Sequence, residues 1–143
     1  MGENSVEHAD PRGIRRGAVE RFFAECVPDG AGPLRFTLIA GGRSNLTYRV
    51  EGPGGTWVLR RPPLGHVLPT AHDMAREYRV LAALAGTDVP VARPIALCTD
   101  TAVNDAPFYV MQHVDGVVLE SKLPPDFAET DADRRRIGDA LVA

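Results

Sequence analysis

The sequence is short of the features that would bring a chain to a membrane or to nucleic acid. No apolar run approaches the roughly 18 residues that a transmembrane helix needs, and the polar, acidic segment 1–10 has no apolar core of a secretory signal. The formal net charge of −3 offers no excess of cations for nucleic acid or for an anionic membrane. We therefore expect a cytoplasmic protein that binds neither.

Cysteine is also scarce. Cys26 and Cys98 are the only two, they lie far apart in the sequence, and each has apolar neighbours. Two such residues in a cytoplasmic chain are typical of reduced, buried thiols. No spacing of cysteine and histidine is typical of a zinc site, so we predict no metal ligands of that kind.

The overall composition is that of an ordinary globular domain. Apolar residues make up 44% of the 143 residues and charged residues 24%. A chain of this length buries roughly two-thirds of the surface of its unfolded form. We therefore expect one domain with a substantial core.

Helical periodicity predicts three helices. The first begins at Asp10 and Pro11, which are typical of an N-cap and a first helical position, and ends near 27–30. Its apolar stripe consists of Ile14, Ala18, Val19, Phe22, Phe23 and Cys26. The second helix covers 71–85, with a stripe of Met74, Tyr78, Leu81 and Ala85. The third begins at Thr130 and reaches Ala143 without a C-cap, so it looks truncated.

Alternation with a period of two predicts the strands. Three of them cover 34–38, 46–50 and 56–61, and the glycine-rich turn at 52–55 joins the last two as a hairpin. Two short apolar runs predict further strands at 95–98 and 108–111, on either side of a polar turn over 99–105. The order of elements favours an α+β fold, with a five-stranded, mainly antiparallel sheet and a helix across it.

The segment 41–61 is the most informative part of the chain. A loop of small residues at 41–45 separates two alternating strands, and the next strand carries Arg60 on the same face as Val58. Backbone N–H groups in such a loop, with a fixed positive charge beyond them, are typical of a site for the phosphates of a nucleotide.

Glu77 is the predicted partner of Arg60. On a helix of 3.6 residues per turn, Glu77 lies about 40° from Leu81, at the edge of the apolar stripe, and faces the sheet. A carboxylate in that position needs a cation, and a pair with Arg60 would leave the guanidinium aimed at whatever lies beneath the loop. The alternative is a surface cation and an edge carboxylate that never meet.

Five segments resemble, in their order and spacing, the amino-terminal lobe of the aminoglycoside phosphotransferase-like family, which has the protein-kinase-like fold. They are 41–48 (GGRSNLTY), 57–63 (WVLRRPP), 76–81 (REYRVL), 89–94 (VPVARP) and 108–116 (FYVMQHVDG). The resemblance extends from about Leu34 to the end of the chain. It implies an ATP- or GTP-dependent phosphotransferase, with magnesium in the complete enzyme and a small-molecule hydroxyl group as acceptor.

The resemblance also implies which residues bind the nucleotide. They are Gly42, Arg43, Ser44, Asn45, Thr47, Val58, Arg60, Glu77, Met111, Gln112, His113 and Val114. Arg60 takes the place of the strand lysine that holds the α- and β-phosphates, and Glu77 matches the helix glutamate that orients it. Residues 42–45 correspond to the phosphate loop, Thr47 and Val58 to the roof over adenine, and 111–114 to the adenine pocket and its connecting segment. Arginine in place of lysine is a departure, although a guanidinium binds phosphate oxygens bidentately.

The catalytic loop of that family, His-x-Asp-x-x-x-x-Asn, has no match. His113 and Asp115 have the spacing of its start, but Glu120 stands where the asparagine is required, and the pair His8 and Asp10 fails in the same way. We therefore predict that this chain has no catalytic or metal-binding residue and does not transfer phosphate by itself.

We predict three parts of the chain: a helical extension (1–30), a kinase-like lobe that roofs the nucleotide (31–116) and the start of a second lobe (117–143). The alternative is a pseudokinase-like interaction module with no catalytic role. We expect apolar residues that would face a second lobe to be partly exposed and to permit self-association. They are Val114, Val117, Val118, Leu119, Ile137 and Leu141. The acceptor, the choice between ATP and GTP, and whether the chain is a piece of a longer protein stay open.

Overall fold

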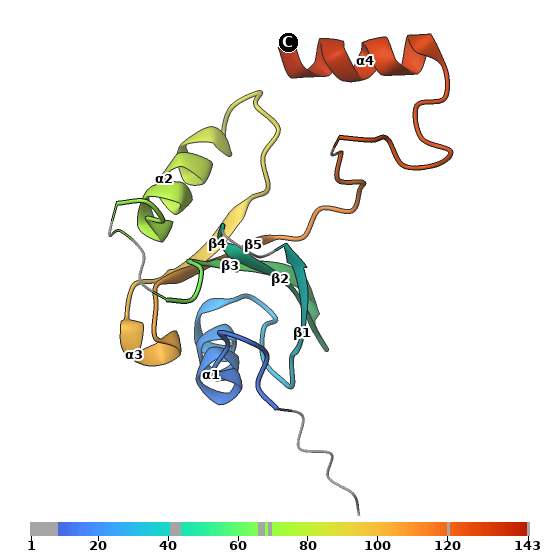
Figure 1. The fold of residues 1–143 in the computed structure, drawn as a ribbon. Coiled ribbons are helices and arrows are strands. Elements are labelled where there is room, and N and C mark those ends of the chain that lie inside the picture. Colours follow the sequence, from blue (N-terminus) through green and yellow to red (C-terminus); the bar gives the residue numbers. More distant parts are fainter. Residues whose placement is uncertain (1–8, 41–43, 66–67, 69, 120, 143) are drawn as a thin grey trace, which may run out of the picture. The chain divides into compact units, whose positions relative to one another are not determined.

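The computed structural model of the chain describes residues 9–40, 44–65, 68, 70–119 and 121–142. The helices are α1 (Arg16–Cys26), α2 (Met74–Leu84), α3 (Thr101–Asn104) and α4 (Asp131–Val142). The strands are β1 (Arg35–Ala40), β2 (Leu46–Gly52), β3 (Gly55–Arg61), β4 (Pro94–Cys98) and β5 (Phe108–Gln112). The fold is α+β with a five-stranded antiparallel sheet, as the sequence predicts (Figure 1).

The strands lie in the order β1-β2-β3-β5-β4, so β3 has β2 on one side and β5 on the other. The register places Arg60 of β3 opposite Thr47 of β2 and opposite Tyr109 of β5. Val58 lies opposite Met111 in the same way. Because directly opposed residues point to the same face of a sheet, these side chains form two adjacent rows on one face.

Helices α1 and α2 lie on opposite faces of the sheet (Figure 1). On the α1 face, Phe23 packs edge-to-face against Trp57 with ring centroids 5.7 Å apart. The buried apolar core lies on this face and consists of Ile14, Val19, Phe23, Val27, Leu34, Leu46, Tyr48, Val50, Trp57, Leu59, Ala96, Cys98, Phe108 and Val110. The α2 face carries the polar row of Thr47, Arg60 and Tyr109, which makes it the face on which a ligand site is to be sought.

Helix α1 begins at Arg16, later than the sequence predicts, and Asp10 does not cap it. The residues before it form a turn, in which the Ile14 N–H donates to the Pro11 carbonyl at 2.9 Å. Arg15 occupies the N-cap position without a side-chain cap. Its backbone N–H donates to Asn104 Oδ1 at 2.8 Å, so a contact 89 residues away decides how the chain enters this helix.

The prediction of two buried thiols is wrong for Cys26. Cys98 is buried in the core, whereas Cys26 is exposed. Cys26 is the last residue of α1, and the next residue, Val27, is extended and buried in its place. The buried part of the apolar stripe within α1 therefore consists of Val19 and Phe23.

Other boundaries differ from the predicted ones as well. Helix α2 begins at Met74 rather than at residue 71, because the Asp73 side chain accepts a hydrogen bond from the Arg76 N–H and caps it there. The predicted turn over 99–105 contains the short helix α3, which Asp100 caps. Strand β1 extends to Ala40, two residues beyond its predicted end, and its Leu38 is 45% exposed.

The chain divides into two compact units, Met1–His113 and Val114–Ala143. The first contains the sheet and helices α1 to α3, and the second contains α4. At the start of α4, Thr130 Oγ1 accepts a hydrogen bond from the Asp133 N–H at 3.1 Å, which is a side-chain N-cap. The predicted boundaries 1–30, 31–116 and 117–143 stay a prediction.

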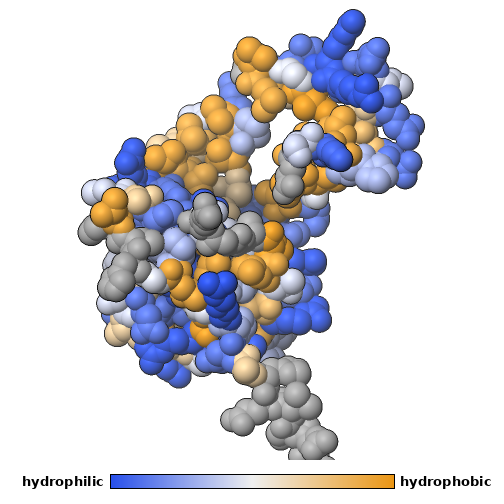
Figure 2. Space-filling model, viewed as in Figure 1, coloured by the Kyte–Doolittle hydropathy of each residue, from blue (hydrophilic) through white to orange (hydrophobic). Residues whose placement is uncertain are grey.

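Several apolar side chains are exposed. Figure 2 shows apolar surface over α2, whose Val80 is 52% exposed. In the second unit, the residues predicted to be exposed are so: Val114, Val117, Val118, Leu119 and Leu141. Ile137 is half-buried. Self-association through these residues stays a prediction. Among the described helices, none is long and apolar enough to cross a membrane.

Candidate functional site

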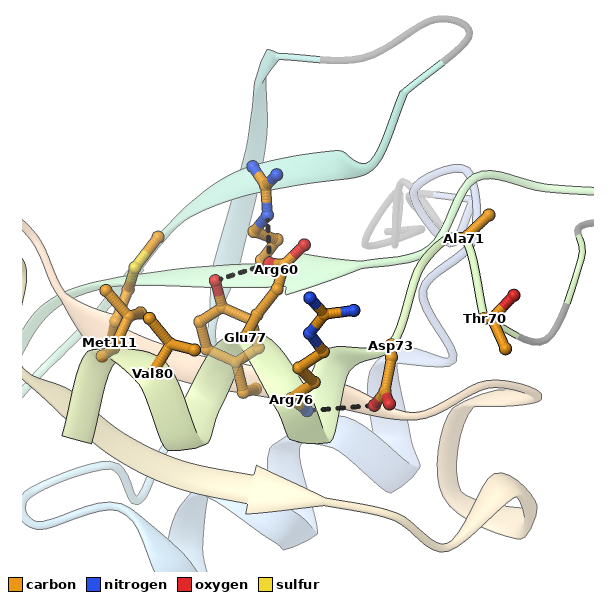
Figure 3. Close-up of a pocket in the computed structure, with 10 residues that line it drawn as sticks. Arg60, Thr70, Ala71, Asp73, Arg76, Glu77, Val80 and Met111 are labelled. Atoms are coloured by element: carbon orange, nitrogen blue, oxygen red, sulfur yellow. Dashed lines mark hydrogen bonds and ion pairs between the residues drawn. The ribbon is translucent and has the colours of Figure 1, made fainter. Parts of the chain in front are cut away.

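A polar cluster lies between β3 and α2, on the face opposite the core. Its centre is the carboxylate of Glu77. Arg60 Nε donates to Glu77 Oε2 at 2.9 Å, and the Tyr109 hydroxyl donates to the same oxygen at 3.0 Å. Figure 3 shows the side chains of Arg60 and Glu77 pointing toward one another from the strand and the helix. The predicted Arg60–Glu77 pair is confirmed.

The second oxygen of Glu77 is bound by Asn45. Asn45 Nδ2 donates to Glu77 Oε1 at 3.0 Å, and the side chain of Asn45 is almost fully buried. Its other atom, Oδ1, lies 2.7 Å from Nδ1 of His72. The place of Asn45 in the phosphate loop stays a prediction, and its side chain binds the helix glutamate and the segment before α2.

Sequence reasoning missed Tyr109 and His72 as members of this cluster. Alternation along β5 places Tyr109 on the same face as Met111, so the signal for Tyr109 was present in the pattern of the strand. His72 precedes α2 in an irregular segment, where no periodicity predicts which way a side chain points. Its position depends on how α2 packs on the sheet.

The environment of Tyr109 keeps its hydroxyl protonated. Burial raises the pKa of Tyr109, and the neighbouring Glu77 carboxylate and the hydrogen bond to it raise the pKa further. The hydroxyl is therefore a permanent donor to Glu77 at neutral pH. Together with Arg60 it gives Oε2 two donors, which compensates a partly buried carboxylate for its lost hydration.

Arg60 keeps part of its hydrogen-bonding capacity. Its Nε is bound to Glu77, and its NH1 group donates to Thr47 Oγ1 at 3.2 Å. Among the described residues, none accepts a hydrogen bond from its NH2 group. The side chain is 32% exposed. The guanidinium is thus held by one edge and accessible at its far end.

A cavity of about 530 Å³ adjoins this cluster. Val80 and Met111 contribute apolar surface to it (Figure 3). Its polar and charged lining consists of Arg60, Asp73, Arg76, Glu77 and Tyr109. A cavity that combines a fixed cation with apolar walls suits a ligand that has both a charged and an apolar part.

The other predicted site residues are brought together only in part. Thr47 and Val58 are buried on the same face as Arg60. Ser44 is exposed just before β2. Gln112 ends β5, and its backbone N–H donates to the Arg93 carbonyl at 2.8 Å. Gly42 and Arg43 lie outside the described residues. His113 ends the first unit, and Val114 begins the second.

The neighbouring Arg61 has a different environment from Arg60. It points to the opposite face, as alternation predicts, and is 5% exposed. Its NH1 donates to the Gly13 carbonyl at 2.7 Å and its Nε to the Pro62 carbonyl at 2.9 Å. Burial lowers the pKa of Arg61. Arg61 therefore anchors the segment before α1 and does not line the cavity, which Arg60 of β3 and Arg76 of α2 do line.

Metal ligands are not grouped in the part of the chain that the structure describes. No three of its His, Cys, Asp and Glu side chains lie close enough to hold an ion. The Arg60–Glu77 pair can orient and bind an anion, but these residues form no metal centre.

A five-stranded antiparallel sheet, crossed by a helix whose glutamate holds a strand arginine, defines the amino-terminal lobe of a protein-kinase-like phosphotransferase. Residues 35–143 match the model of the phosphotransferase enzyme family, and the chain belongs to this family. A solved structure from Ralstonia eutropha JMP134, provisionally assigned as an aminoglycoside phosphotransferase, is 41% identical with a TM-score of 0.61. The similarity covers 78% of this chain and 31% of that one.

Longer proteins contain a similar segment. Acyl-CoA dehydrogenase family member 11 of Gallus gallus is 37% identical over 115 residues, which are 78% of this chain and 15% of that protein. Acyl-CoA dehydrogenase family member 10 of Mus musculus is 36% identical over 113 residues, which are 78% of this chain and 11% of that protein. The chain thus spans less than a sixth of the length of these relatives.

Proposed function

We propose that this chain binds ATP or GTP on the α2 face of its sheet and acts as the nucleotide-binding lobe of a small-molecule phosphotransferase. The observation that carries the proposal is the contact between Arg60 Nε and Glu77 Oε2 at 2.9 Å. It holds a cation on the face of the sheet that carries α2. Family membership supports the same reading.

The remaining N–H groups of Arg60 suit phosphate oxygens. A guanidinium presents its donors in a planar fork, and NH1 and NH2 together match two oxygens of a phosphate. Thr47 Oγ1 lies 3.2 Å from NH1 and adds a hydroxyl at the same place. The site is partly withdrawn from water, which strengthens its attraction for an anion.

The base of the nucleotide would lie over the row of side chains next to Arg60 on the α2 face of the sheet. Val58 and Met111 are opposite one another in the register and offer apolar surface next to Arg60. Gln112 and His113 follow Met111, and the backbone of this segment would bind adenine or guanine as it does in the family. Val114 continues this segment, and we include it among the residues proposed to bind the base for the same reason.

In the complete reaction, a nucleotide with its magnesium ion supplies the γ-phosphoryl group for an acceptor hydroxyl. The residues of this chain would bind and orient the α- and β-phosphates. The described residues do not fit a metal site, so we assign no metal-binding or proton-transfer step to them. The identity of the acceptor is likewise not part of the proposal.

The names of the longer relatives do not extend a dehydrogenase activity to this chain. The segment that they share with it overlaps residues 35–143, which match the phosphotransferase family model. Only 15% of the first relative is covered. The similarity is therefore best explained by a phosphotransferase-like segment within larger proteins.

Titration calorimetry with ATP and with GTP, each with magnesium, tests the proposal. We expect saturable binding that Arg60→Ala weakens. The matched control is Arg79→Ala, which removes the same charge from an exposed position on α2. If the wild-type chain binds neither nucleotide, or if the two variants bind equally well, the proposal is wrong and the interaction module becomes the better explanation.

A further inference from the structure

We propose that Asn45 and His72 are positioning residues, which hold the Glu77 carboxylate in the orientation that directs Arg60 toward a phosphate. The inference rests on the proposed nucleotide-binding function and deepens it. It assigns a role to the side chain of His72, which no sequence pattern indicates, and gives the side chain of Asn45 a role as a support of the helix glutamate.

The chemistry of the partners determines how Asn45 is oriented. An ionised carboxylate only accepts hydrogen bonds, so the atom of Asn45 that lies 3.0 Å from Glu77 Oε1 is the amide nitrogen. The amide oxygen then faces His72 Nδ1 at 2.7 Å. An amide oxygen also only accepts, so Nδ1 of His72 carries a hydrogen.

This arrangement selects one tautomer of His72. The neutral imidazole has a single N–H, and here that hydrogen lies on Nδ1. The chain of donors therefore runs in one direction, from His72 to Asn45 and from Asn45 to Glu77. Hydrogen bonds aligned in this way polarise one another, so each supports the next.

Glu77 needs such support because the torsion of a carboxylate is soft. The last side-chain torsion of glutamate has broad minima, and Arg60 and Tyr109 both bind the single oxygen Oε2. Among the described residues, Asn45 is the one that binds Oε1. Its hydrogen bond therefore fixes the rotation of the carboxylate, and with it the direction of the Arg60 guanidinium.

The three residues of this series of hydrogen bonds lie in different segments of the proposed site. Asn45 immediately precedes β2, His72 immediately precedes Asp73, the N-cap of α2, and Glu77 lies on α2 itself. The hydrogen bonds thus connect the start of β2, helix α2 and, through Arg60, the central strand β3. These are the segments that would surround the phosphates.

The tautomer can be tested without any nucleotide. Long-range ¹H–¹⁵N spectra of the imidazole distinguish the two neutral tautomers. For His72 we expect the form protonated at Nδ1. The form protonated at Nε2 would overturn the inference, because Asn45 would then lack its donor.

A matched pair of variants tests the positioning role. His72→Leu removes the donor, whereas His72→Asn places an amide N–H near the position of Nδ1. We expect His72→Leu to weaken binding of ATP with magnesium about 3- to 10-fold, as for the loss of one hydrogen bond, and His72→Asn to stay within about 2-fold of the wild type. The ¹H–¹⁵Nε resonance of Arg60 should shift in the first variant and not in the second.

Asn45→Asp gives an isosteric check. It places an acceptor opposite Glu77 Oε1, so the two carboxylates repel each other and the Arg60 resonance should shift as in His72→Leu. Asn104→Ala controls for stability, because Asn104 has other partners: its Nδ2 and Arg61 NH1 both donate to the Gly13 carbonyl. It should lower the stability of the fold and leave ATP affinity unchanged.

The outcomes separate the two proposals. If the wild-type chain fails to bind ATP, the proposed function is wrong and the positioning role falls with it. If the wild type binds ATP but His72→Leu binds equally well, or His72→Asn fails to rescue, the positioning inference alone is wrong.

Discussion

The Nε atom of Arg60 on β3 lies 2.9 Å from Oε2 of Glu77 on α2, and these two residues are 17 positions apart in the chain. Both side chains are about one-third exposed, at 32% and 33%. A wholly exposed ion pair contributes little to stability, whereas a partly buried one with further donors keeps its geometry. The contact is therefore better suited to holding a cation in place for a ligand than to stabilising the fold.

Replacing Arg60 should weaken nucleotide binding. Arg60→Ala removes a charged donor, and we expect a loss of about 1.5–3 kcal/mol in the free energy of binding. Arg60→Lys should lose less, because the charge remains while the planar fork is lost. Titration calorimetry measures both. Equal affinities of the wild type and Arg60→Ala would show that no phosphate contacts this residue.

Tyr109→Phe should make stability less sensitive to alkaline pH. The pKa of Tyr109 is raised above the value of 10.0 for an exposed phenol. Above pH 10 the unfolded chain loses this proton first, so the free energy of unfolding falls, by up to about 1.4 kcal/mol per pH unit. Below pH 10 both states keep the proton and the contribution stays constant. Urea unfolding from pH 7 to 11 should therefore show a shallower fall for the variant above pH 10.

At pH 7 the same variant should be less stable by about 1 kcal/mol, the net value of one hydrogen bond. The comparison uses Tyr48→Phe as a second variant. Burial also raises the pKa of Tyr48. Tyr48→Phe should therefore also make the free energy of unfolding fall less steeply above pH 10. Parallel curves for the wild type and Tyr109→Phe would contradict the assignment.

Asn104→Ala should destabilise the fold by about 2–3 kcal/mol, since it leaves buried partners without a hydrogen bond. Asn104 is 1% exposed. Its Oδ1 accepts from the Arg15 N–H at 2.8 Å and its Nδ2 donates to the Gly13 carbonyl at 3.1 Å. Chemical denaturation measures the loss.

Asp105→Asn is the control for this prediction. Asp105 has a positive φ of 61°, which asparagine tolerates, and its ion pair with Arg15 is exposed and 3.5 Å long. The control should change stability by less than about 0.5 kcal/mol. If both variants change the free energy of unfolding by the same amount, the buried hydrogen bonds of Asn104 contribute no more to stability than the exposed ion pair of Asp105.

The two cysteines should react at different rates with a thiol reagent under native conditions. Cys26 is exposed and should react at once, whereas Cys98 is 4% exposed and should react only on unfolding. Burial also raises the pKa of Cys98, which lowers its fraction of reactive thiolate. Ellman titration counts the thiols. Cys26→Ser should abolish the fast reaction, and two fast thiols in the wild type would contradict the buried position of Cys98.

The exposed apolar residues of the second unit should promote self-association. Val117, Val118 and Leu119 are consecutive and are 50%, 80% and 42% exposed. A run of this kind favours contact with another apolar surface. We expect light scattering to show oligomers at high concentration, and Val118→Asp to reduce them. A monomeric wild type would contradict the prediction.

Much of the site could be predicted from short-range rules. The period of two along β3 separates Arg60 from Arg61, because successive side chains of a strand point to opposite faces. The turn of 3.6 residues places Glu77 on the side of α2 that faces the sheet. Those two rules are local, so the sequence by itself determined which arginine meets which glutamate, and the class of the fold with it.

Contacts between distant parts of the chain decided the rest. The order of strands puts Tyr109 beside Arg60, and the packing of α2 brings His72 to Asn45. The start of α1 depends on Asn104, 89 residues from Arg15. A hydrogen bond of this kind forms only when both elements are already packed, and no local propensity encodes it. The tertiary structure alone therefore decided how Glu77 is held, and so which way Arg60 points.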